Sequence, residues 1–385
     1  MKVRESLAVQ PTGVNVRVRL RQRAQILEKT GEIIVVMRSR AARFPDSAEV
    51  RWFLLQVCAG VEVSEVPALA DGQDLTITPE VAQSIFDVLD SINALEQLDV
   101  EHRLTPENLE RNSRSLEYLS PLESEAGSRF EMHERVVRSS VLLIGTGGLG
   151  SWIAYGLAAA AVGRLGLCDP DTVDLSNLNR SVLFDRGSVG KPKVDAARER
   201  LSEFAPELQI QTCTERIAGP ADVARLGEGF DLIIGAADQP HRKIRRWVAE
   251  GSLRSGVPSL QAGGGRIGPL YLPGKSSCAG CLQASLALPG SEMDVLAEQF
   301  GRFPTRSPGS LPPFPAAESG MVVLEAYRYL SQMSPPVTVN GYVAEGPNLF
   351  DGKVVELKPH PACVVCGGGD GRESSANSST EQVRR

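Results

Sequence analysis

The amino-acid sequence predicts an α/β protein in which a domain with a parallel-rich sheet follows a small N-terminal α+β module. From Val141 to about residue 262, apolar strand-like segments alternate with helix-like segments, which is typical of a parallel sheet. Before residue 104, strand-like and helix-like patterns form a separate block with its own charge distribution. The length of 385 residues agrees with two to three domains.

Composition excludes several classes of protein. The chain is 42% hydrophobic and 23% charged, which is typical of a soluble globular protein and not of a collagen-like or disordered one. The net charge of −6 argues against a chain that coats nucleic acid or acidic lipid. The N-terminus carries no secretory signal, so we expect a cytoplasmic protein whose seven cysteines form no disulfide framework.

One stretch is long enough to imitate a membrane span. Residues 141–163 contain no charged residue, and 23 residues exceed the usual length of such a span. Six of them are glycines, four of which lie between Gly145 and Gly150. A strand, a glycine turn and a helix explain this composition better, so we expect no membrane association.

The N-terminal module is predicted over residues 1–103. Residues 1–45 carry ten Lys or Arg against three Glu, a net charge of +7, whereas residues 46–110 carry two Arg against fourteen acids, a net charge of −12. Apolar residues alternate with polar ones from Val14 to Leu20, which predicts a half-buried strand. A second strand near Ile26 and a third over residues 33–37 flank a turn at Gly31 and predict a hairpin.

Two helices should complete this module and give it a winged-helix-like composition. Asp46 and Glu49 have the spacing of a capping box. The first helix then has an apolar repeat and a glycine that can end it, at Val50, Phe53, Leu54, Val57 and Gly60. The second follows Thr78 and Pro79, with an apolar stripe at Val81, Ile85, Val88, Ile92 and Leu95.

The remaining segments are a connector, a larger domain and a tail. Residues 104–138 are predicted to be a connector with helical stretches, and residues 139–366 the larger domain. Its strand candidates are Val141–Ile144, Leu165–Cys168, Ile210–Thr212 and Leu232–Ile234. A proline-rich loop region is predicted over residues 286–320, a helix from Ser319 to Met333, and a disordered tail over residues 367–385.

A glycine-rich turn follows the first strand of the larger domain. Its glycines, which match the spacing G-x-G-x-x-G, are Gly145, Gly147, Gly148 and Gly150. In this position they let the backbone approach a phosphate at the N-terminus of a helix, and Asp169 at the end of the next strand can accept ribose hydroxyls. This much fits a dinucleotide-dependent oxidoreductase, and a tight packing turn is the alternative.

The next segments favour another family. Residues 169–180, Asp-Pro-Asp-Thr-Val-Asp-Leu-Ser-Asn-Leu-Asn-Arg, lead into Val-Gly-Lys-Pro-Lys at residues 189–193, and residues 233–238 read Ile-Ile-Gly-Ala-Ala-Asp. In this order they closely resemble the ThiF/MoeB family of ATP-dependent adenylating enzymes, over residues 110–366. The resemblance implies a Rossmann-like ATP-binding adenylation domain.

The resemblance also implies a role for each matching residue. Asp169 would bind the ribose of ATP, while Asn177, Arg180 and Lys193 would contact the triphosphate. Asp238 would hold Mg²⁺. Arg114, in the R-x-x-R segment of residues 111–114, would reach into the site of a neighbouring subunit in a homodimer. Taken singly, each Arg or Lys could instead lie on a solvated face.

Four cysteines have the spacing of metal ligands. Two C-x-x-C pairs, Cys278 with Cys281 and Cys363 with Cys366, suit a structural Zn²⁺ with four thiolates. The other three cysteines lie in apolar patterns and are expected in the core: Cys58, Cys168 and Cys213. No cysteine lies between residues 281 and 363, where thioester-forming relatives usually place theirs.

The N-terminal module suggests the substrate. It resembles the leader-peptide recognition elements of ribosomal-peptide modification enzymes, and its fusion to an adenylation domain resembles the MccB-type peptide adenylyltransferases. The resemblance therefore implies ATP-dependent adenylation of a carboxylate of a precursor peptide. Activation of a ubiquitin-like sulfur-carrier protein and a non-catalytic leader-binding scaffold remain alternatives. For the module itself, a dimerisation or packing role is an alternative. The net charge of −12 over residues 46–110 argues against DNA binding.

Overall fold

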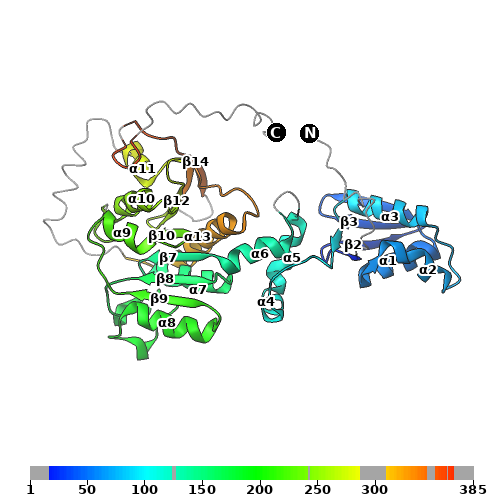
Figure 1. Ribbon diagram of the computed structural model, residues 1–385, viewed down its shortest axis with the longest axis horizontal. Coiled ribbons are helices and arrows are strands. Elements are labelled where there is room, and N and C mark those ends of the chain that lie inside the picture. Colours follow the sequence, from blue (N-terminus) through cyan, green and yellow to red (C-terminus); the bar gives the residue numbers. More distant parts are fainter. Residues whose placement is uncertain are drawn as a thin grey trace. The chain divides into compact units, whose positions relative to one another are not determined.

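The computed structural model describes residues 17–123, 127–241, 243–286, 309–344, 352–361 and 363–367 (Figure 1). The chain divides between residues 134 and 135 into two compact units. The first residues of the predicted N-terminal strand and residues 368–385 of the predicted tail lie outside these ranges. No helix within them combines the length and the hydropathy that a membrane span needs.

The first unit contains two small antiparallel sheets. In one, β1 (Arg17–Leu20) lies between β5 (Val61–Glu62) and β6 (Leu95–Gln97). The other has the order β2 (Gln25–Lys29), β3 (Glu32–Met37) and β4 (Arg40–Pro45). The pairing of β2 with β3 confirms the predicted hairpin.

The helices of the first unit begin largely where the sequence predicts, with two corrections. In α1 (Ala48–Ala59) the cap is Ser47, because Asp46 pairs with Arg51 instead. Thr78 caps α3 (Pro79–Ser91) as predicted, but the buried face lies one residue further on, at Ala82, Ile85, Phe86 and Leu89. Val81 and Val88 are exposed, and Leu95 belongs to β6. The short α2 (Val66–Asp71) lies between α1 and α3.

The predicted connector is helical, with α4 (Pro106–Arg111), α5 (Ser113–Leu119) and α6 (Arg129–Arg138). A buried carboxylate joins it to the sheet: Glu96 of β6 accepts hydrogen bonds from Arg19, Ser120 and Arg129. Burial alone would raise the pKa of Glu96, but Arg129 and Arg19 hold it below its usual range. Removing either arginine would be costly, because it would leave the buried carboxylate of Glu96 with less compensating charge.

The second unit is built on an eight-stranded sheet, and all four predicted strands are present in it. Five neighbouring strands are parallel: β11 (Ser259–Ala262), β10 (Leu232–Gly235), β7 (Ser140–Ile144), β8 (Arg164–Cys168) and β9 (Gln209–Cys213). Three antiparallel strands extend the β11 edge: β12 (Arg266–Tyr271), β13 (Gly341–Ala344) and β14 (Lys353–Glu356). The predicted α/β fold with a parallel-rich sheet is confirmed.

Helices cover both faces of this sheet (Figure 1). Val141 and Leu143 of β7 pack with α7 (Gly148–Ala159), α8 (Lys193–Phe204) and α13 (Pro313–Ser331). The alternate residues Leu142 and Ile144 pack with α9 (Pro220–Gly227) and α10 (Lys243–Ser255). Helix α13 begins at Pro313, six residues before the predicted start, because a proline is compatible with the first turn of a helix.

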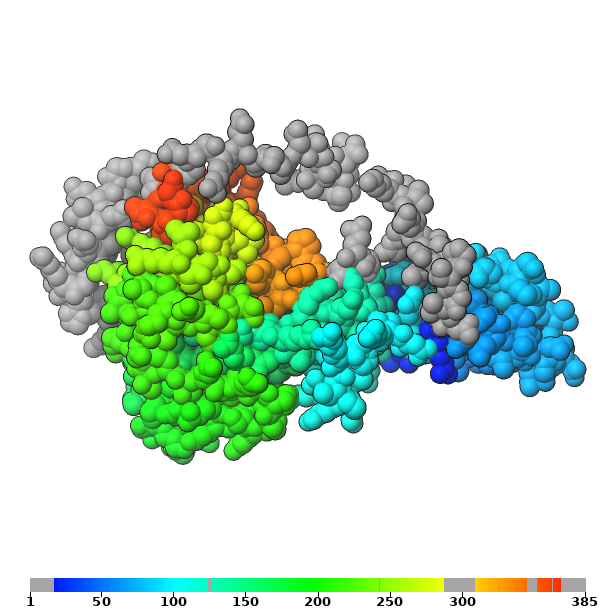
Figure 2. Space-filling view, viewed as in Figure 1, coloured from blue at the N-terminus to red at the C-terminus, as the bar shows by residue number. Residues whose placement is uncertain are grey.

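The C-terminal end of the described chain returns to the sheet edge. Residues 352–361 and 363–367, coloured red, lie against the yellow surface that includes α11 (Ala279–Leu286) in Figure 2. Leu282 of α11 shares a hydrophobic cluster with Leu357 and Val365. Among the three cysteines predicted in the core, Cys168 is buried and Cys213 half-buried, but Cys58 is exposed on the outer side of α1.

Candidate functional site

The candidate site lies where the chain reverses direction across the parallel sheet. Strand β7 has β8 on one side and β10 on the other, and the chain reaches β10 only after building β8 and β9. At such a switch point the loops after the strands diverge and leave a crevice for a ligand. Three sequence-predicted groups follow these strands: the glycine turn after β7, Asp169 after β8 and Asp238 after β10.

The turn after β7 requires glycine at two positions. Gly145 has a φ of +95°, and a Cβ there would lie 2.7 Å from the backbone N of Ala237. A Cβ at Gly150 would lie 1.9 Å from the carbonyl O of Gly145. Gly147, which precedes α7, has nothing within 4 Å of its Cβ position. The N–H groups of the first turn of α7 are therefore accessible to an anion, which the helix dipole also favours.

Asp169 joins the loop after β8 to the glycine turn. Its side chain is almost completely buried, with Oδ2 accepting from the backbone N of Thr146 at 2.7 Å and Oδ1 accepting from the backbone N of Asp171 at 3.0 Å. A carboxylate has about four acceptor sites, so these two hydrogen bonds leave capacity for ribose hydroxyls. Asp169 therefore holds the glycine turn in place and can also accept ribose hydroxyls, which is the role that the sequence predicts.

Two predicted cations lie beside this loop. The side chain of Arg180 passes the glycine turn, with its Cδ 3.0 Å from the Cβ position of Gly148, and its guanidinium donates to the carbonyl of Ser176 at 2.7 Å. Lys193, the first residue of α8, places its Nζ 3.0 Å from Oδ2 of Asp171 and 3.9 Å from Oδ1 of Asp169. Two positive charges thus flank the site on the β8 side.

The remaining predicted residues have different environments. Asn177 is buried in a 3₁₀ turn (Leu175–Asn177), where its Oδ1 accepts from the backbone N of Asp174 at 3.1 Å. Asp238 is exposed, and its loop touches the glycine turn through Ala237. Arg114 is exposed on α5, in the first unit, so its role at this site stays a prediction.

Sequence reasoning assigned no role to Asp171. Its exposed carboxylate is the nearest ion-pair partner of Lys193, and it also lies 3.7 Å from Arg216. The signal was present in the sequence, because Asp171 stands two residues after Asp169 in the same loop. Without coordinates, that spacing does not show which of the two carboxylates faces the lysine.

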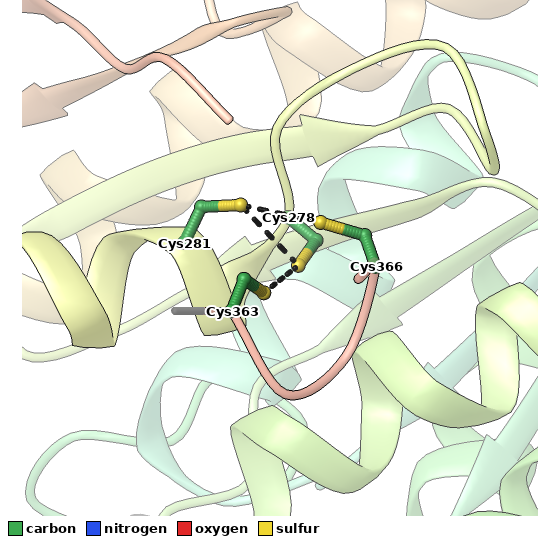
Figure 3. Close-up of side chains that lie close together, drawn as sticks. All are labelled: Cys278, Cys281, Cys363 and Cys366. Carbon is green, nitrogen blue, oxygen red and sulfur yellow. Dashed lines mark hydrogen bonds between the residues drawn. The ribbon is translucent and has the colours of Figure 1, made fainter. Parts of the chain in front are cut away.

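The four predicted zinc ligands come together at the far edge of the same unit. Figure 3 shows the sulfurs of Cys278 and Cys281, at the start of α11, pointing toward those of Cys363 and Cys366 in the C-terminal segment. All four sulfurs lie within 4.8 Å of one another, and none forms a disulfide. Segments more than 80 residues apart in the chain therefore share one sulfur cluster.

The cluster has the dimensions of a tetrahedral metal site. Tetrahedral zinc with Zn–S bonds of about 2.3 Å places its ligands about 3.8 Å apart. The measured separations are 3.9 Å for Cys278–Cys281, 3.5 Å for Cys278–Cys363 and 3.4 Å for Cys281–Cys366. A hydrogen bond from the Cys278 thiol lowers the pKa of Cys281, which also accepts from the backbone N of His360 at 3.4 Å.

Comparisons with known proteins agree with this fold. The model of the ThiF family matches residues 118–365. The sulfur carrier protein ThiS adenylyltransferase of Escherichia coli (strain K12) is 30% identical over 247 residues, which are 61% of this chain and 88% of that protein. The molybdopterin-synthase adenylyltransferase of the same strain is 30% identical over 248 residues, covering 63% of this chain and 92% of that protein.

A solved structure resembles a larger part of the chain. The crystal structure of E. coli MccB with MccA-N7isoASN superposes with a TM-score of 0.70 at 19% sequence identity. The superposition covers 91% of this chain and 100% of that chain. The likeness is one of fold, and it extends beyond the segment that the family model matches.

Proposed function

Since this chain belongs to the ThiF family and is an adenylyltransferase of the ThiF/MoeB type, we propose that it adenylates a carboxylate of a ribosomally made precursor peptide. One observation carries the choice of a peptide. The fold of MccB, which has been solved with MccA and with ATP, covers 91% of this chain, whereas the ThiS adenylyltransferase covers 61%. The additional part of the chain that the MccB fold covers includes the N-terminal module.

The proposed reaction converts a poor acyl donor into a good one. A carboxylate oxygen of the peptide attacks the α-phosphorus of ATP, and the bond from that phosphorus to the bridging oxygen breaks. Pyrophosphate leaves with the electron pair, and the products are the acyl-adenylate and pyrophosphate. Negative charge gathers on the phosphate oxygens in the transition state, so fixed cations there should contribute most of the acceleration.

Each site residue has a position that suits one part of this reaction. The first turn of α7, open at Gly147, would bind phosphate through backbone N–H groups. Asp169 would accept the ribose hydroxyls, and Arg180 and Lys193 would neutralise the phosphate oxygens. Asn177 would act through the shape of its turn, because its side chain is buried and bonded to the backbone.

The loop of Asp238 suits a magnesium ion. Mg²⁺ in nucleotide sites is usually held by one or two carboxylates together with substrate phosphates and water. Asp238 offers one exposed carboxylate at the edge where the glycine turn ends β7, and its loop contacts that turn. The ion would supply charge neutralisation on the departing pyrophosphate when bound with ATP.

We assign Cys278, Cys281, Cys363 and Cys366 to a structural Zn²⁺. A closed set of four thiolates leaves no position for a substrate, which is the arrangement of structural sites. The ion would join α11 to the end of the described chain, beside the hydrophobic cluster of Leu282, Leu357 and Val365.

For the N-terminal module we propose leader-peptide capture. Strand β2 is an outer strand of its sheet, all five of its residues are exposed, and Ile26 and Leu27 present apolar side chains to solvent. An outer strand can bind an extended peptide through backbone hydrogen bonds. The net charge of +7 over residues 1–45 favours an acidic leader.

Sulfur-carrier activation is the second candidate, and the 30% identity to two carrier-activating enzymes favours it. A non-catalytic scaffold is the third, and the intact set of Asp169, Arg180, Lys193 and Asp238 argues against it. Both catalytic candidates share the adenylation step and differ only in the chain that supplies the carboxylate.

Exchange of labelled pyrophosphate into ATP separates the three candidates. It should be run with a candidate precursor peptide, with a sulfur-carrier protein, and with neither, together with an assay for AMP or AMP-labelled peptide. Peptide-dependent exchange or AMP transfer supports the proposal. Carrier-dependent exchange would replace it, and an enzyme that binds the leader but forms neither product would favour the scaffold.

A further inference from the structure

Arg245, in the first turn of α10, lies beside the site on the side away from Arg180 and Lys193. Its Nη2 donates to the carbonyl of Gly263 at 2.5 Å. Gly263 begins the turn between β11 and β12, at the same sheet edge as Asp238. By strand order, Arg245 therefore lies on the β10–β11 side of the glycine turn, and the other two cations lie on its β8 side.

The turn that holds Arg245 is close to the phosphate-binding turn. A Cβ at Gly263 would lie 3.4 Å from Nη2 of Arg245 and 3.5 Å from Cδ2 of Leu149. Leu149 is itself part of the glycine turn after β7. The guanidinium and the start of α7 are therefore separated by roughly one side chain.

The turn itself places no side chain over the guanidinium, because its three residues are glycines. Gly263, Gly264 and Gly265 have φ values of +109°, +66° and +70°, which side chains other than glycine rarely adopt. A Cβ at Gly264 would lie 3.1 Å from Nη2 of Arg245. Three successive glycines thus provide a path along which an extended chain end can pass close to this cation.

Within the described part of the chain, Arg245 is a partly desolvated cation without an ion pair. Burial lowers its pKa, and neighbouring Glu318 and Asp238 attract it from beyond contact distance. Among the residues that the structure describes, no carboxylate oxygen lies within 4.0 Å of its guanidinium nitrogens. A partly desolvated charge without an ion pair is costly, so an anion supplied by a ligand would be bound with favourable energy.

We propose that Arg245 binds a carboxylate at the reactive end of the peptide substrate, whose last residues lie over the Gly263–Gly265 turn. This rests on the proposed function for the nature of the substrate. The negative triphosphate repels a carboxylate that approaches it. Arg245, a cation on the β10–β11 side of the glycine turn, would offset this repulsion. Arg245 is thus a substrate-binding residue, whereas Arg180 and Lys193 act on the phosphates.

Carboxylate binding can be tested without turnover by using acetate as the probe. The melting temperature of the full chain with ATP is measured in sodium acetate and in sodium chloride of equal ionic strength. The matched control is Arg246→Gln, because Arg246 is the next residue but pairs with Glu250 on the exposed side of α10. Wild type and Arg246→Gln should melt a few degrees higher in acetate, and Arg245→Gln should not. An equal rise in Arg245→Gln, or none in wild type, would overturn the assignment.

The substrate's identity is tested by pyrophosphate exchange with random peptides, both alone and fused behind a candidate leader, bearing either a free or an amidated C-terminus. Arg245→Gln should lower the peptide's kcat/KM by about 10- to 100-fold, with the KM for ATP unchanged and Arg245→Lys intermediate. If amidation of the C-terminus abolishes exchange, the terminal carboxylate is the one that is adenylated. If exchange persists after amidation, a side-chain carboxylate is adenylated. If the wild type shows no exchange with any peptide, the proposal of a peptide substrate is refuted. The acetate measurement would still decide whether Arg245 binds a carboxylate.

Discussion

Lys193 and Asp171 form an ion pair in which Nζ and Oδ2 are 3.0 Å apart, at the start of α8. The lysine side chain is 11% exposed and the aspartate side chain 54% exposed, so the cation is fixed and its partner is solvated. A solvated partner gives up the lysine at low cost when a phosphate arrives. The pair therefore holds Lys193 toward the nucleotide without blocking it.

Removing this cation should affect turnover more than nucleotide binding. Lys193→Ala and Arg180→Ala should each lower kcat by roughly 10²–10³-fold, because both charges act mainly in the transition state. Asp238→Ala should be at least as damaging. Lys191→Ala is the matched control, since Lys191 is exposed and pairs with Glu199. Pyrophosphate exchange at saturating ATP measures the effect, and equal rates for Lys193→Ala and Lys191→Ala would contradict it.

The glycine turn offers two substitutions with opposite expected outcomes. Gly150→Ala places a methyl group 1.9 Å from the carbonyl O of Gly145, so the turn must move and ATP binding should fall at least tenfold. Gly147→Ala has open space and a φ of −69°, so it should keep the wild-type melting temperature. Calorimetric titration with ATP and a thermal melt compare them. Wild-type ATP affinity in Gly150→Ala would show that this contact relaxes without consequence.

The four-cysteine cluster should contain about one zinc ion per chain by elemental analysis. Cys363→Ala removes one ligand and should release the metal and lower the melting temperature, because binding of a structural ion stabilises the folded chain. Cys58→Ala is the control, since Cys58 is exposed and remote in sequence from the cluster. A metal-free wild type with unchanged stability in Cys363→Ala would refute the zinc site.

The strands of the larger domain were predictable because their positions follow from short apolar runs between glycines and charges. Val141–Ile144 is buried on both faces, which is why it reads as a continuous apolar segment. The helix faces were less predictable. In α3 the helical spacing of apolar residues is compatible with burial of either Val81 or Ala82. Only packing against the rest of the module decides that Ala82 is buried and Val81 exposed.

The site was predictable only where its chemistry is local in the chain. The glycine turn and each C-x-x-C pair span only a few residues, and Asp169 directly follows the next strand after the turn. The place of Arg245 depends on the turn at Gly263, 18 residues away, and on the parallel pairing of β10 with β11. No short-range pattern contains that contact, so the sequence alone did not reveal it.

If Arg114 completes the site of a neighbouring subunit, two inactive variants should complement each other. Arg114→Ala mixed with Lys193→Ala forms heterodimers in which one of two sites keeps both residues. Random exchange makes about half of the dimers mixed, so about a quarter of the wild-type activity should return. Native mass spectrometry confirms the exchange. No recovery after exchange would place Arg114 in its own subunit's site or give it a structural role.

His133, in α6, is completely buried, and burial lowers its pKa to about 4. The unfolded chain binds a proton at this histidine near pH 6.5, whereas the folded chain does not. Its contribution to stability is therefore complete above pH 6.5 and is lost as the pH falls toward 4, by about 2 kcal/mol at pH 5. His133→Gln removes this contribution. Urea unfolding at pH 7.5 and pH 5 should show a smaller pH-dependent loss in the variant, and an equal loss in both proteins would exclude His133 as its source.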